Sequence, residues 1–109
     1  MKNSFMDKLV ENYNNGYRLK TVEYRFIRAY ADSEDKETLV FDSFNGFFPN
    51  ELVDASNVMD SAGIDSFISF DNSTALMDTL QHFLGLGYTI EPVIVNKGVY
   101  IQKGLKFTR

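Results

Sequence analysis

Turn-forming residues divide this 109-residue chain into short patterned segments, and that division constrains the fold more than any other feature. No apolar run approaches the roughly 18 residues of a membrane span. The pattern predicts short helices and strands joined by tight turns, packed as one compact domain over residues 1–109. The dividing segments are Asn14-Asn15-Gly16, Asp32-Ser33-Glu34-Asp35, Asn45-Gly46, Gly63, Gly85-Leu86-Gly87 and Asn96-Lys97-Gly98.

Three segments carry apolar residues at helical spacing. The first begins at Ser4, which is a good capping residue, and ends before Asn14-Asn15-Gly16. The second begins at Pro49 or Asn50 and ends at Gly63, and the third follows Asp71, Asn72 or Ser73 and ends at Gly85. Their apolar stripes are 5, 6, 9, 10 and 13; 52, 55, 59 and 62; and 76, 77, 80, 83 and 84.

The remaining patterned segments predict strands. Residues 17–30 alternate with a period of two, and with residues 37–44 they predict an antiparallel hairpin. Residues 64–70 predict a short buried strand, and residues 88–95 and 99–102 predict a second hairpin. Pro92 places the first strand of that hairpin at a sheet edge or bulge, and we expect residues 103–109 to fray.

These elements follow one another as α-β-β-α-β-α-β-β. The order predicts an α+β fold with one mainly antiparallel sheet of about five strands and about three helices packed on a face. The pattern does not predict the strand order.

Several kinds of chemistry lack the residues they need. The chain has no cysteine, which excludes disulfides, thiolate nucleophiles and cysteine-bearing zinc sites. His82, the only histidine, cannot form a multi-histidine site, and its spacing from Asp78 is typical of an exposed ion pair on a helix. The acidic segments do not keep the spacing of a calcium loop. We therefore expect a protein that is not an enzyme, with no catalytic residue, metal or cofactor.

Charge is distributed unevenly along the sequence. Residues 1–28 carry a net charge of +3 and residues 97–109 carry +4, whereas residues 29–96 hold twelve acids against Lys36 alone. A surface of one sign attracts oppositely charged partners. The alternative is that these acids only cap turns and helices and keep the protein soluble.

The leading hypothesis is a small binding protein that engages a protein partner through this acidic segment. Size and charge resemble compact phage or mobile-element inhibitors that mimic nucleic acid and engage a nuclease or another basic, nucleic-acid-handling protein. This likeness is an analogy of size and charge. The candidate contact residues are Asp32, Glu34, Asp35, Glu37, Asp42, Phe47, Glu51 and Asp54. Phe47 is included because Phe44, Phe47 and Phe48 are too close in sequence to be buried together.

Two alternatives remain. Tyr24, Phe26 and Tyr30, with Arg18, Lys20, Arg25 and Arg28 around them, would suit a nucleic-acid-binding strand, although a pI of 4.8 disfavours direct nucleic-acid binding. The second alternative is self-association, for example a homodimer, through a hairpin edge. With neither a signal peptide nor a membrane span, we expect a cytoplasmic protein that does not contact membranes.

Overall fold

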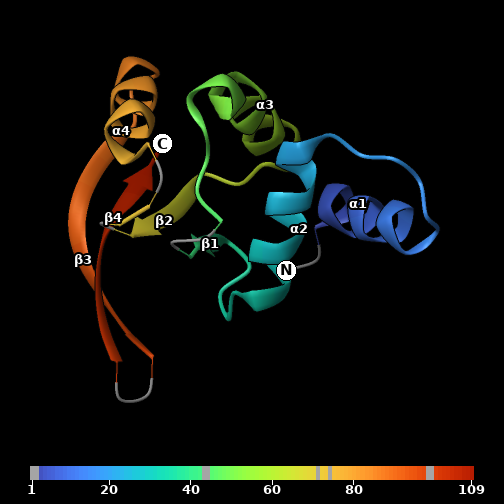
Figure 1. Cartoon of the computed structure of the whole chain (residues 1–109), viewed down its shortest axis with the longest axis horizontal. Helices are drawn as coiled ribbons and strands as arrows, with labels where there is room; N and C mark the ends of the chain where they lie inside the picture. The colour runs from blue at the N-terminus through green and yellow to red at the C-terminus, as the bar shows by residue number, and fades with distance from the viewer. Residues whose placement is uncertain (1–2, 43–44, 71, 74, 98–99) are drawn as a thin grey trace.

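The computed structural model describes residues 3–42, 45–70, 72–73, 75–97 and 100–109, and Figure 1 shows the whole chain. The helices are α1 (Ser4–Asn14), α2 (Thr21–Asp32), α3 (Leu52–Ala62), which follows the 3₁₀ turn η1 (Pro49–Glu51), and α4 (Leu76–Gly85). The strands are β1 (Thr38–Phe41), β2 (Ser66–Phe70), β3 (Thr89–Lys97) and β4 (Tyr100–Thr108). No helix in the described ranges is long and apolar enough to cross a membrane.

One mixed sheet has the order β1-β2-β4-β3. β1 and β2 run parallel, with α3 in the connection between them, whereas β4 is antiparallel to both of its neighbours. The expected α+β class is confirmed. The expected numbers need correction, because the described residues form four strands and four α-helices, and one of the three strand pairings is parallel.

The main error concerns residues 17–30, most of which belong to the helix α2 and not to a strand. Its buried residues are Val22, Phe26, Ile27 and Ala29, which recur at the helical spacing i, i+4, i+5 and i+7. Val, Tyr, Phe and Ile favour strands in isolation, but tertiary packing overrides this preference. Glu23 supports the helix start, since its carboxylate accepts a hydrogen bond of 2.8 Å from the Lys20 amide. The predicted hairpin with residues 37–44 is therefore wrong, and only Thr38–Phe41 form a strand in the described part of that segment.

The other predicted elements are confirmed with small changes. α1 is capped by Asn3, whose side chain accepts a hydrogen bond from the Met6 amide, and not by Ser4. α3 ends at Gly63, whose φ of 65° is the left-handed conformation that glycine adopts readily. α4 starts after Ala75, not at a side-chain cap, and the candidate cap Asp71 lies outside the described residues.

The chain end is ordered, contrary to the expected fraying of residues 103–109. These residues form the second half of β4, and their register pairs Phe107 with Phe67 of β2. Phe107 is fully buried. The arrangement has a simple cause, because residues 105 and 107 are alternate apolar positions of a strand that faces the core.

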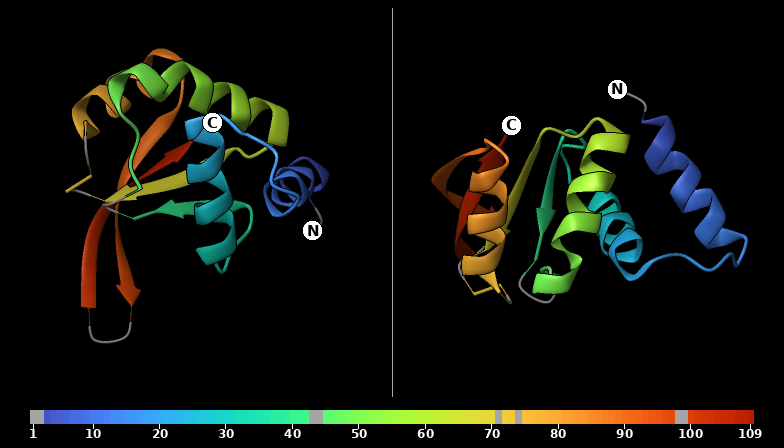
Figure 2. Two further views of the ribbon diagram at one scale, coloured as in Figure 1. Left: turned by 45° about the vertical axis from the view of Figure 1, so that its right-hand side comes forward. Right: turned by 90° about the horizontal axis from the view of Figure 1, so that it is seen from above.

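All helices that touch the sheet lie on one side of it, which we call the helix face (Figure 2). Strand residues on this side include Leu39, Phe41, Phe67 and Phe107, which belong to the main buried cluster. Phe67 is central, since its ring stacks on Phe107 at 4.5 Å and meets Phe83 of α4 at 4.9 Å between centroids. The aromatic side chains of this sequence therefore form the core.

The opposite side of the sheet, the open face, carries the alternate strand residues. They include Val40, Ile68, Val93, Val95 and Lys106, which are only partly buried. β3 and β4 also extend beyond the end of β2, because β2 pairs only with residues 104–108 of β4. Residues 94–97 and 100–103 thus form a two-stranded arm that projects from the sheet (Figures 1 and 2).

Candidate functional site

Four of the eight predicted contact residues come together around one hollow of about 410 Å³ on the open face. These are Asp32, Glu34, Asp35 and Asp42, and we call this feature the acidic hollow. Asp32 is the last residue of α2, Glu34 and Asp35 form the turn that follows, and Asp42 comes directly after β1. The turn that reverses the chain between α2 and β1 therefore brings acids from both sides to the same place.

The lining of the acidic hollow includes three apolar side chains. Val40 and Ile68 come from β1 and β2, and Val95 comes from the projecting arm. Sequence reasoning missed these residues, although alternation within β1 and β2 predicts that Val40 and Ile68 point away from Phe41 and Phe67. An acidic rim over an apolar floor suits a long side chain with an apolar stem and a charged end.

The electrostatics of the hollow favour cations. The last turn of α2 contains no basic residue and carries Asp32, so the negative end of the helix dipole and a carboxylate act together. Two cations oppose them: Arg28 lies 3.3 Å from the Asp42 carboxylate and 3.9 Å from that of Asp32, and Lys106 lines the floor. Glu34 and Asp35 are exposed.

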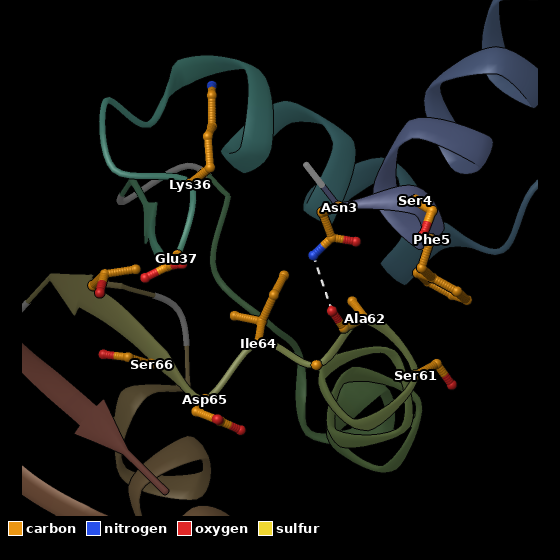
Figure 3. Close-up of a pocket in the computed structure, with 12 residues that line it drawn as sticks. Asn3, Ser4, Phe5, Lys36, Glu37, Ser61, Ala62, Ile64, Asp65 and Ser66 are labelled. Carbon is orange, nitrogen blue, oxygen red and sulfur yellow. Dashed lines mark hydrogen bonds between the residues drawn. The ribbon is translucent and has the colours of Figure 1, made fainter. Parts of the chain in front are cut away.

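The next acid, Glu37, lies at a second cavity of about 500 Å³ between the start of α1, the end of α3 and the start of β2 (Figure 3). Asn3 closes one side of this cavity by donating a hydrogen bond of 2.9 Å to the Ala62 carbonyl. The carboxylates of Glu37 and Asp65 lie apart, and Asp65 pairs with Arg109. The cavity therefore does not bring charged groups to one point.

The last three predicted contact residues lie elsewhere. Phe47 is 2% exposed and packs against Phe41 at 4.8 Å, so it belongs to the core and does not form an exposed anchor. Phe48 is 48% exposed, and Phe44 lies outside the described residues. Asp54 lines a separate small cavity beside α1.

Glu51 is also unavailable to a partner. Its carboxylate is buried, accepts a hydrogen bond of 2.8 Å from the Phe48 amide and pairs with Arg25 at 3.1 Å. The pair fixes the start of α3 against α2. Glu51 and Arg25 thus perform a structural role that charge counting does not reveal.

The basic and aromatic residues of the 18–30 segment do not share one face. Phe26 is fully buried, and Arg25 is held by Glu51 and lies over the Phe48 ring. Arg28 pairs with Asp32 and Asp42, two of the acids that line the acidic hollow. The strand face expected for nucleic-acid binding is therefore not formed, because the segment is a helix.

His82 joins two helices. Its Nε2 lies 3.4 Å from the Ser56 hydroxyl of α3, and this hydroxyl donates to the Val53 carbonyl at 2.9 Å. The expected ion pair with Asp78 is not among those found in the described part of the chain. Among these same residues, no group of three or more histidine, aspartate or glutamate side chains is placed to hold a metal ion.

Comparison with protein-family models, with curated proteins and with solved structures finds no match to this chain.

Proposed function

We propose that this chain is a non-catalytic binding protein whose acidic hollow receives a lysine- or arginine-containing segment of a protein partner. The observation that supports the proposal is the convergence of Asp32, Glu34, Asp35 and Asp42 on one hollow, from three consecutive parts of the chain.

The hollow matches the two parts of a basic side chain. Val40, Ile68 and Val95 offer an apolar surface to the aliphatic stem, and the carboxylates at the rim offer acceptors to the charged end. Arg28 already occupies part of this acidic surface through Asp42, so an incoming cation competes with it. Charge attraction raises the association rate most at low salt, which makes salt a direct probe.

Within this proposal, the partner is a basic protein that handles nucleic acid, such as a nuclease, and binding inhibits it. The acidic surface then takes the place of a nucleic-acid backbone. Two features support a basic, nucleic-acid-handling partner. The chain has a negative net charge of −4, and its acids are concentrated between residues 29 and 96. A compact inhibitor of the phage or mobile-element kind fits the same size and charge.

The first test is capture of partners from a host lysate by the tagged chain at low and high salt, followed by mass spectrometry. We expect a basic protein to be retained at low salt and lost at high salt. Retention of nucleic acid alone would argue for the alternative function.

A pair of matched variants then tests the site. The hollow variant carries Asp32→Asn, Glu34→Gln and Asp35→Asn, and the control variant carries Glu11→Gln, Asp54→Asn and Asp78→Asn, so the net charge changes equally. We expect the hollow variant to bind the captured partner at least about tenfold more weakly and the control to bind within about twofold of the wild type. Equal losses in both variants would contradict a local site.

A further inference from the structure

The two edges of the sheet differ. At the β1 edge, the Val40 amide donates to the Ser33 hydroxyl at 2.9 Å, and this hydroxyl donates to the Ala29 carbonyl at the end of α2. α2 therefore covers that edge. β3 forms the other edge, and in the described part of the chain no element pairs with its outer side.

The hydrogen bonds of β4 show which β3 residues point outward. The Arg109 amide donates to the Asp65 carbonyl at 2.8 Å. Arg109 follows β4 and Asp65 precedes β2, so these two residues form a hydrogen-bonded pair that continues the β2–β4 pairing. Strand residues alternate between their two neighbours, so Lys106 and Gly104 bond to β3, opposite Glu91 and Val93. The backbone groups that face away from the sheet are therefore those of Ile90, Pro92, Ile94 and Asn96.

Exposed apolar side chains surround this open edge. Ile94 and Ile101 lie on the same side of the arm and are 65% and 72% exposed. On α4, Met77 and Leu84 are 66% and 51% exposed. Since His82 on the other flank of α4 contacts α3, Met77 and Leu84 lie on the flank directed toward the β3 edge.

The arm itself lacks a covering layer. A two-stranded hairpin is marginally stable in water unless further strands or a helix cover it. Large β-branched side chains exposed on such an arm indicate a surface that is buried in an assembly.

We propose that this edge pairs with the β3 edge of a second copy, antiparallel and about a two-fold axis at Ile94, to form one continuous eight-stranded sheet. A two-fold axis makes the contact self-complementary and closed. With Ile94 opposite Ile94, Pro92 lies opposite Asn96 of the second copy. The Asn96 amide still has the Pro92 carbonyl as its acceptor, so the missing proline N–H removes one bond per copy without preventing the pairing.

Charge complementarity favours a second copy over an unrelated strand. In this register, Glu91 of one copy lies opposite position 97 of the other, which is a lysine in the sequence, and symmetry produces this pair twice. Val93 lies opposite Val95 on the same side of the new sheet. On the other side of the new sheet, the row of Ile101 and Asn96 in one copy continues into Pro92 of the second copy.

The test is the mass of the full chain by analytical ultracentrifugation over a concentration series. We expect the wild type to reach twice its 12.5 kDa. Glu91→Lys and Lys97→Glu should each weaken association at least tenfold, because each places two like charges opposite each other. Mixing these two variants restores both opposite-charge pairs, so the mixture should form the dimer again, as should the chain that carries both changes.

Thermal melting of each variant separates loss of folding from loss of association. A wild type that stays monomeric up to millimolar concentration would overturn the proposal. Failure of the mixed variants to associate would also overturn it and would indicate that an unrelated strand occupies the edge. Val95 and Asn96 of the arm also line the acidic hollow, but the hollow variant changes only carboxylates at the end of α2 and in the turn after it, so it should keep the mass of the wild type.

Discussion

The two faces of the sheet use the same strands for different purposes. On the helix face, the side chains of Leu39, Phe41, Phe67 and Phe107 are at most 1% exposed. On the open face, Val40, Ile68 and Val95 remain partly exposed and line the acidic hollow. Neighbouring residues of one strand thus differ in role because successive side chains point to opposite sides. The comparison teaches that stability depends on the helix face, whereas the proposed binding site lies on the open face.

The largest effect should come from adjacent residues that face opposite ways. Phe67→Ala removes a ring that stacks on Phe107 and contacts Phe83, so it should cost about 3–5 kcal/mol of unfolding free energy. Ile68→Ala, on the open face, should cost about 1 kcal/mol because its side chain is already partly exposed. Urea unfolding of both variants measures the difference. Equal losses would show that both faces support the fold.

A second prediction concerns Gly104, where the open face is tightly packed. A Cβ atom on Gly104 would lie 2.9 Å from the Ser69 carbonyl oxygen and 3.3 Å from atoms of Ile68 and Phe70. Gly104→Ala should therefore cost about 1–3 kcal/mol through overpacking. Gly85→Ala is the control, because nothing lies within 4 Å of its Cβ position and the residue ends α4. We expect this control to be neutral or to stabilise by up to about 1 kcal/mol in the same urea experiment.

The course of the chain after residue 31 could largely be predicted from the sequence. Apolar spacing and turn residues predict the positions of β1, α3, β2, α4, β3 and the first part of β4, but not the second half of β4, which was expected to fray. The 17–30 segment could not be assigned this way, since Val22 and Phe26 fit both periods and the strand-forming residue types favour the wrong one. The Lys20 amide does bond to the Glu23 carboxylate, but a lysine has no side-chain acceptor for a capping box, so the sequence did not signal this helix start.

The candidate site could be predicted only in part. Acids close in sequence, from Asp32 to Asp42, meet because one turn connects them. Glu51 and Phe47 were misplaced because burial depends on contacts with distant residues: Glu51 pairs with Arg25, and Phe47 packs on Phe26 and Phe41. The apolar floor required the pairing of β1 with β2, which the sequence pattern did not predict.

A third prediction uses pH to test a buried residue of the core, Tyr88. Tyr88 is 5% exposed, and burial raises the pKa of its phenol above the ordinary 10.0, opposed by the nearby Arg109. As pH rises past 10.0, the unfolded chain ionises first, so stability falls until the pH exceeds the raised folded pKa. Tyr88→Phe should reduce this alkaline loss and change stability by less than about 1 kcal/mol at neutral pH. Thermal melts from pH 7 to 11 measure both effects. If stability fell equally with rising pH in Tyr88→Phe and in the wild type, Tyr88 would have no part in the alkaline loss of stability. Tyr30, whose pKa is also raised by burial, would then be its source.

The smallest expected effect concerns the carboxylates of the acidic hollow. The hollow variant, with Asp32→Asn, Glu34→Gln and Asp35→Asn, should change the unfolding free energy by no more than about 0.5 kcal/mol, because these side chains are exposed. Two small effects oppose each other: neutralising Asp32 removes a repulsion at the negative end of α2 but also loses its exposed pair with Arg28, so the net change should lie near zero. Urea unfolding at low and high salt measures the change, with the Glu11, Asp54 and Asp78 control variant alongside. A loss of several kcal/mol confined to the hollow variant would mean that these acids hold the fold together, and the division of labour between the two faces would then be wrong.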